Sequence, residues 1–207
     1  MKRLLTIWAL LAVAAFQPAT AADVPAGAYT LDKSHASLLF RVNHLGFSNY
    51  TARFDSFEAK LQFDPDNLTA SRVEVTIDPR SIKADNAPPG FLNTLQGPQW
   101  LDAAKFPEMT FRSTQVDRRG PHSVRIHGDL TLHGVTQQII LDAIYNGGYA
   151  GHPMAPRARI GFSARGTFKR SDFGIAYGIP AHGSSMGVSD DVQVVIEAEF
   201  SGPPLRK

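Results

Sequence analysis

An arginine and an aspartate extend an apolar strand pattern near residue 170 and could bind a polar group. From Ala158 to Phe168 the even positions are apolar or glycine, and Arg170 and Asp172 continue this row. Strand side chains alternate between two faces, so the apolar row and the charged groups are predicted to share a face. An unpaired charge there is costly, so Arg170 needs a partner, which Asp172, Asp190 or an anionic ligand head could supply. An apolar wall with a charged rim suits an amphiphile.

A Gly-x-Ser-x-Gly pattern at residues 183–187 makes Ser185 a candidate nucleophile. In hydrolases this elbow joins a strand tightly to a helix, whereas here it lies in a glycine-rich loop that a strand pattern follows. We interpret the segment as a flexible loop over a cavity mouth. The alternative, a loop-borne serine hydrolase that uses Ser185, stays open.

The seven histidines do not predict a metal site. His127 and His133 share a strand face but lie six residues apart, roughly 20 Å at ~3.3 Å per residue. Two ligands of one ion each lie within about 2.1 Å of it. We therefore expect no metal, although convergence from distant loops, for instance of His152 with His182, stays open. A resident cofactor and a catalytic residue are not expected either.

The N-terminus has the pattern of a secretory signal peptide. Lys2 and Arg3 precede the apolar run 4–16, and Ala19-Thr20-Ala21 is a small-x-small cleavage site. The apolar run is shorter than the ~20 residues that span a bilayer. We expect residues 1–22 to be removed, residues 23–207 to form a single domain without a membrane span, and the protein to be periplasmic or secreted.

Charge and cysteine content restrict the class of partner. Without Lys2 and Arg3 the 19 remaining Lys and Arg residues equal the 19 Asp and Glu residues. The absence of a cationic excess disfavours nucleic-acid binding. The chain has no cysteine, so it forms no disulfide and carries no lipid-modified cysteine.

Eight segments have the alternation of half-buried strands, and turn residues separate them. Regularly spaced strands with little helix predict an all-β, antiparallel fold, and eight strands can close into a barrel that holds one ligand. The segments are 36–44, 57–63, 73–77, a strand opening at Met109 and Phe111, 124–132, 138–145, 158–172 and 190–200.

Residues 84–105 interrupt the strand pattern between the third and fourth strands. Phe91, Leu92 and Leu95 fit a short helix, and Pro98 could open a second helix that leads to Trp100. The segment could be a packed surface loop or an apolar lid.

If the strands run alternately up and down, one rim gathers this insertion, His44, His133, Arg170, Asp172 and Asp190. We predict a ligand cavity with a mouth at that rim. Its predicted residues are Phe40, Val42, His44, Leu61, Phe63, Val75, Phe91, Leu95, Trp100, Ile126, Leu130, Phe162, Phe168, Arg170, Asp172, Asp190 and Val194.

Alternation alone does not say which face is inside. In an outer-membrane barrel the apolar rows would face lipid and the charged rows the lumen. The strands carry few of the Tyr and Trp residues that form membrane girdles, and Trp100 lies in the insertion. The outer-membrane barrel is therefore a disfavoured alternative.

Five segments together form a specific set of motifs: residues 29–35, 40–46, 105–114, 128–136 and 170–174. Through them the chain is similar to the YceI-like family of secreted, lipocalin-like polyisoprenoid-binding proteins. The resemblance implies an eight-stranded lipocalin-like barrel whose elongated apolar pocket takes a polyisoprenoid, with no established catalytic activity. Residues 85–92 are richer in proline than the family pattern, so the identity of the ligand's head group is not taken from the resemblance.

From these observations we predict a non-catalytic carrier of a long-chain isoprenoid, such as a quinone or a polyprenyl phosphate. The expected partner is thus a small amphiphilic lipid, and a homodimer is left open. A third possibility is a filled barrel whose function lies on its surface. A hollow interior would support the carrier hypothesis, and a filled one would remove it.

Overall fold

A computed structural model describes residues 24–151 and 154–204 of the chain. The predicted signal peptide, residues 1–22, lies outside these ranges. None of the helices in the described part is long and apolar enough to cross a bilayer.

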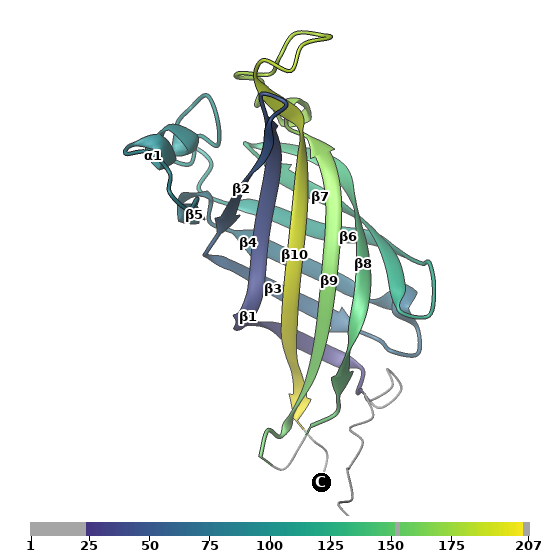
Figure 1. Cartoon of the computed structure of the whole chain (residues 1–207). Helices are drawn as coiled ribbons and strands as arrows, with labels where there is room; N and C mark the ends of the chain where they lie inside the picture. Colours follow the sequence, from purple (N-terminus) through teal and green to yellow (C-terminus); the bar gives the residue numbers. More distant parts are fainter. Residues whose placement is uncertain (1–23, 152–153, 205–207) are drawn as a thin grey trace, which may run out of the picture.

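Antiparallel strands close into a barrel (Figure 1). The neighbour order is β10-β9-β8-β7-β6-β4-β3-β1-β2-β5, and pairing of β10 with β1 closes the sheet. The strands are β1 (Gly27–His44), β2 (Ser48–Phe54), β3 (Phe57–Phe63), β4 (Arg72–Ile77), β5 (Ile82–Lys83), β6 (Met109–Arg118), β7 (Ser123–Leu132), β8 (Val135–Tyr149), β9 (Arg157–Lys169) and β10 (Val188–Pro204). Eight of them correspond to the predicted strands, so the predicted barrel is confirmed.

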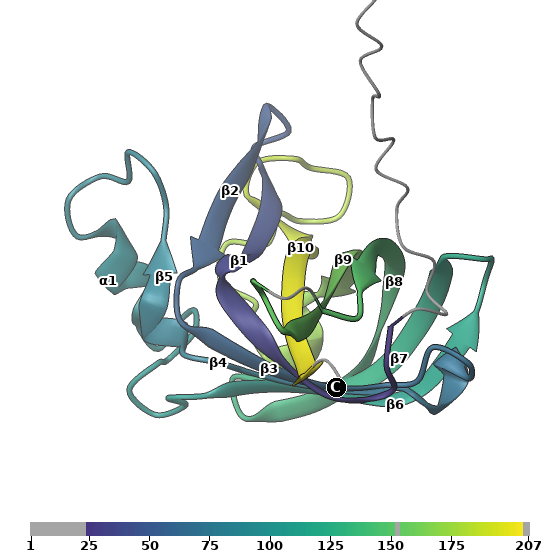
Figure 2. The same cartoon turned by 90° about the horizontal axis from the view of Figure 1, so that it is seen from below.

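The sequence patterns missed two short strands, β2 and β5. The long strand β1 pairs with β3 near Gly27 and with β2 from Leu38 to His44, so β2 and β3 act as one strand that is interrupted at residues 55–56. β5 adds to the outer edge of β2. Together with α1 (Phe91–Gln96), these elements extend to one side of the barrel (Figure 2).

The apolar rows face inward. In β3, Ala59, Leu61 and Phe63 are buried, whereas the intervening Glu58, Lys60 and Gln62 are exposed. An outer-membrane barrel requires the opposite arrangement, so that alternative is wrong. Buried residues form two clusters, one around Leu38 and Phe173 and the other around Tyr29 and Phe200.

Short helices cap the barrel strands. α1 confirms the predicted insertion helix, but residues 98–101 form turns, so the predicted second helix is wrong. Three single-turn 3-10 helices follow β3, β4 and β9: η2 (Leu68–Ala70), η3 (Pro79–Ser81) and η4 (Arg170–Phe173). Because η4 begins at Arg170, the strand does not continue to Asp172 as expected.

The end of the barrel where β1 stops and β10 starts is called the upper end here (top of Figure 1). It includes the β1–β2 turn, the 84–105 insertion, the β7–β8 turn and the loop 174–187. The amide of Leu45 donates to the carbonyl of Gly187 (2.9 Å). The opposite end, with the β3–β4, β6–β7 and β8–β9 connections, is called the lower end.

Candidate ligand cavity

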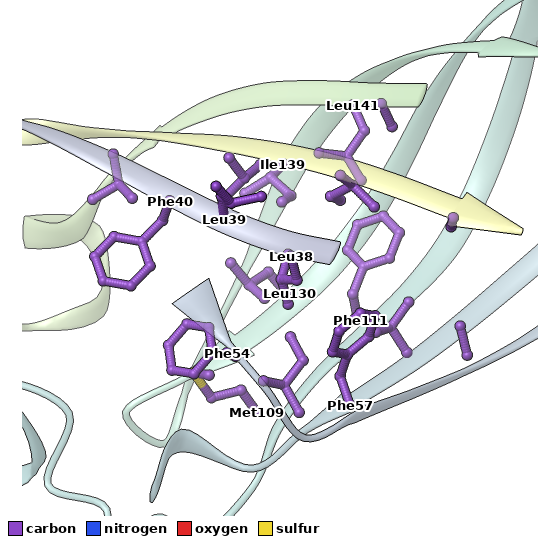
Figure 3. A pocket seen from close by; sticks show the side chains of 18 of the residues that line it. Leu38, Leu39, Phe40, Phe54, Phe57, Met109, Phe111, Leu130, Ile139 and Leu141 are labelled. Carbon is purple, nitrogen blue, oxygen red and sulfur yellow. The ribbon is translucent and has the colours of Figure 1, made fainter. Parts of the chain in front are cut away.

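The inward rows do not meet, and a cavity of about 530 Å³ lies between them. Figure 3 shows side chains from β1, β2, β3, β6, β7 and β8 around this space, and those drawn are hydrocarbon apart from the sulfur of Met109. An engineered apolar cavity of about 150 Å³ stays dry and binds benzene, and pockets for small ligands measure roughly 300–1,000 Å³. The cavity therefore has the size and the chemistry of a site for an apolar ligand.

Most residues predicted for the site line this cavity, but two do not. Asp172 is exposed, and Asp190 is held outside the cavity by Ser171, whose amide and hydroxyl donate to its carboxylate (2.9 and 2.8 Å). The chain turns into η4 after Lys169, which rotates Asp172 away from the barrel axis. The predicted residues in the lining are Phe40, Val42, His44, Leu61, Phe63, Val75, Phe91, Leu95, Trp100, Ile126, Leu130, Phe162, Phe168, Arg170 and Val194.

Arg170 is bound by the backbone rather than by a carboxylate. Its guanidinium donates to four carbonyl oxygens, and only 3% of the residue is exposed. Burial lowers the pKa of the Arg170 guanidinium, and the charge of Asp190 opposes this shift. The four acceptors are the carbonyls of Ser189 (2.9 Å), Ile175 (3.0 Å), Tyr177 (2.8 Å) and Val188 (2.9 Å).

This geometry corrects the expected pairing of Arg170 with Asp172 or Asp190. All four acceptors belong to residues 175–189, which comprise the loop before β10 and the first two residues of that strand. Carbonyl dipoles stabilise a buried cation when several converge on it. Arg170 thus fastens this loop to the upper end of the barrel.

Aromatic side chains enclose the cavity at the upper end. The rings of Tyr50 and Phe91 meet edge to face with centroids 5.8 Å apart, and Trp100 contacts Tyr177 in the same way at 5.7 Å. The Tyr50 hydroxyl and the Trp100 indole nitrogen are buried without a hydrogen-bond partner in the structure. His44 lines the cavity but is exposed, as expected for a residue at its mouth.

A second aromatic group narrows the cavity toward the lower end. Phe63 stacks with Tyr145 at 6.0 Å between centroids, and Phe162 contacts both rings and Phe200. Tyr145 and Phe200 were not among the predicted site residues. Phe200 has the inward phase of Val194, so the alternation alone could have identified it. Tyr145 lies at the end of the predicted strand 138–145, whose mixed pattern did not show which residues face inward.

The sequence matches the YceI-like domain over residues 29–200, nearly the whole described part. The chain belongs to the YceI-like family. A UPF0312 protein of Vibrio cholerae is 35% identical over 173 residues, which cover 83% of this chain and 85% of the relative. The YceI protein of Campylobacter jejuni has a solved structure that is 32% identical, with a TM-score of 0.66, covering 78% of this chain and 90% of that one.

A more distant solved structure supports the barrel architecture alone. It is a polyisoprenoid binding domain from Saccharophagus degradans, 17% identical, with a TM-score of 0.61. The superposition covers 84% of this chain and 98% of that chain.

One YceI-like motif, residues 29–35, forms a bulge in β1 that the sequence did not predict. Leu31 pairs with Phe200 and Ala36 with Ala198, so four residues of β1 oppose one residue of β10. Asp32 lies in this bulge, where it pairs with Arg159 and His35. Hydrogen bonds from these partners lower the pKa of Asp32 to about 2.

The bulge also brings together three possible metal ligands, Asp32, His35 and Glu199, whose ligand atoms lie within 4.8 Å of one another. The Arg159 guanidinium contacts both carboxylates, at 3.8 Å for Glu199. A cation from the chain itself therefore already pairs with both carboxylates, and we interpret the cluster as an ion-pair network.

The hydrolase alternative lacks the required geometry. β10, a strand, follows the 183–187 pentapeptide, whereas a nucleophile elbow feeds a helix. Within residues 24–151 and 154–204, no hydrogen bond joins a histidine to the Ser185 hydroxyl. The pentapeptide is instead part of the loop that Arg170 fastens.

Proposed function

We propose that this YceI-like protein is a non-catalytic carrier of a long-chain polyisoprenoid outside the cytoplasm, in the periplasm or as a secreted protein. The observation that carries this proposal is the hollow, apolar interior of about 530 Å³. Empty apolar space of this size lowers the stability of a barrel, because its walls lack contacts that a filled core would have. A function that uses the space explains why it is there.

The elongated shape of the cavity favours a chain-like ligand. Its lining extends from Phe91 and Trp100 at the upper end to Phe63 and Tyr145 at the lower end. Each methylene buried there contributes about 0.8 kcal/mol before the cost of ordering the tail. Ten methylenes contribute about 8 kcal/mol before that cost, which is the free energy of micromolar binding, so a longer tail is needed to offset the cost. The S. degradans protein of similar fold is a polyisoprenoid binding domain, which agrees with this ligand class.

The proposal is tested by native mass spectrometry of the protein purified from its own host, with extraction and identification of bound lipid. We expect a mass increase that corresponds to one isoprenoid per chain. A protein that is free of hydrocarbon, and that also takes up no isoprenoid when this is supplied in detergent, contradicts the proposal.

A further inference from the structure

Three segments at the upper end contain no charged residue. Residues 42–52, 86–101 and 173–189 lack Asp, Glu, Lys and Arg, although these types make up 19% of the sequence. At the lower end, the β3–β4 connection carries Asp64 and Asp66, and the β6–β7 connection with the end of β6 carries Asp117, Arg118 and Arg119, whereas residues 143–156 of the β8–β9 hairpin carry no charge. Three uncharged segments therefore lie at the upper end, and one lies at the lower end.

The three segments form one continuous surface. Residues 42–52 are joined to 173–189 by the Leu45–Gly187 hydrogen bond and to 86–101 by the Tyr50–Phe91 ring contact. The Trp100–Tyr177 contact joins 86–101 to 173–189. Figure 1 shows the β1–β2 turn and the loop before β10 projecting together beyond the barrel. We call these three segments the neutral surface.

Large apolar side chains project from the neutral surface. Phe47 is 82% exposed, Met186 is 71% exposed and Tyr177 is 53% exposed. Charged side chains begin where the surface ends, at Arg53, which pairs with Asp55 and Asp85. Exposed apolar groups bordered by polar residues are typical of surfaces that contact a membrane or another protein.

The neutral surface is also continuous with the cavity. Tyr50, Phe91 and Trp100 contribute to both, as do Ile175 and Val188. A long apolar tail is poorly soluble in water, so its exchange is fastest where the cavity meets the bilayer directly.

We infer that the neutral surface docks on a lipid bilayer, and that the cargo enters and leaves the cavity there. This inference rests on the proposed function for the cargo, but the docking itself can be measured without any cargo. Because the surface carries no formal charge, docking depends on apolar burial and is expected to be insensitive to salt.

The first experiment measures flotation with phosphatidylcholine vesicles. It uses the protein in the processed form that its host cell produces. Met186→Asp and Phe47→Asp each lower the partition coefficient about tenfold or more, since each removes an apolar side chain from the interface. Met154→Asp is the matched control, because Met154 is 90% exposed but lies on the β8–β9 connection at the lower end. Both tested residues are exposed, and unchanged thermal unfolding confirms that the variants are folded.

Three results would overturn the inference: no flotation of the wild-type protein, equal loss in Met154→Asp and Met186→Asp, or release of the protein from vesicles by about 1 M salt, which screens exposed charges beyond about 3 Å. If the neutral surface binds another protein and not lipid, the wild-type protein will not float with the vesicles.

The second experiment separates docking from cargo binding. A fluorescent polyprenyl probe is delivered either from vesicles or in detergent micelles. In Met186→Asp, we expect uptake from vesicles to slow about tenfold, and uptake from micelles to stay unchanged. Equal uptake from vesicles in both proteins contradicts entry through this surface. Failure of the wild-type protein to take up the probe from micelles contradicts the proposed function, and flotation then still tests docking.

Discussion

The indole ring of Trp100 lies over the guanidinium of Arg170, with 5.2 Å between the guanidinium carbon and the ring centroid. The face of an indole attracts a cation, and this attraction is stronger where water is excluded. The contact joins the 84–105 insertion to η4, which follows β9, while the four carbonyl bonds of Arg170 join η4 to the loop before β10 and to the first two residues of β10. Arg170 is thus the residue that organises the upper end of the cavity.

Replacing Arg170 with methionine is expected to destabilise the protein by about 3 kcal/mol or more, because it leaves four carbonyls without their donors. Urea unfolding followed by circular dichroism measures the change. Arg165→Met is the matched control on the exposed face of β9 and should change stability by less than about 0.5 kcal/mol. Equal stability of the two variants would contradict the structural role of Arg170.

Ala164→Phe is expected to fill part of the cavity, since Ala164 lines it. The new ring occupies space that the lipid tail would use, so affinity for a polyprenyl probe should fall about tenfold or more while the barrel stays folded. Probe titration and thermal unfolding give the two readouts.

Ala158→Phe is the matched comparison on the same strand, because Ala158 is completely buried and does not line the cavity. Overpacking there should cost about 1–3 kcal/mol of stability. If Ala164→Phe destabilised the fold as strongly and left the affinity unchanged, the space beside Ala164 would not be a ligand site.

The ion pair of Asp32 with Arg159 should make stability depend on pH. The pKa of Asp32 is about 2 in the folded protein, below the ~3.9 of an unfolded chain. Its stabilising effect is therefore complete above about pH 5 and is lost as the pH falls toward 2. Because the group is partly solvated, we expect Asp32→Asn to cost about 1–2 kcal/mol at pH 7.

The measurement is urea unfolding of wild type and Asp32→Asn between pH 7 and pH 2, where the two stabilities should converge. Asp66→Asn, an exposed carboxylate in the β3–β4 loop, is the control. A constant difference between wild type and Asp32→Asn over this range would show that the loss arises from packing and not from ionisation.

Gly202→Ala should destabilise the barrel where β10 crosses β1. A Cβ atom at residue 202 would lie 2.0 Å from Cε1 of Tyr29. The Tyr29 ring cannot easily move, since it is 1% exposed and its hydroxyl donates to the carbonyl of Pro25 (2.7 Å). We expect a loss of about 1–3 kcal/mol in urea unfolding.

Gly161→Ala provides the control for this substitution, because its added Cβ would meet only Asn146, at 3.8 Å. It should change stability by less than about 0.5 kcal/mol. A similar loss in both variants would mean that glycine is required for strand geometry in general and not for the contact with Tyr29.

The period-two alternation of residues such as Ala59, Leu61 and Phe63 was sufficient to predict the strands and the face that each one buries. This pattern is local, since neighbouring side chains point to opposite faces whatever the rest of the chain does. The same locality explains the errors. The residue pattern of β2 is mixed, and this segment is a strand because it pairs with β1. The turn at Arg170 depends on contacts with residues 175–189.

The order of residues along the chain was enough to establish that eight apolar rows exist, that Arg170 is buried with them, and that three segments carry no charge. The folded barrel was needed to see that the rows enclose about 530 Å³, and that carbonyl groups rather than Asp172 or Asp190 bind Arg170. Whether facing rows meet depends on the curvature and closure of the whole sheet, which arise from pairings between residues far apart in the chain.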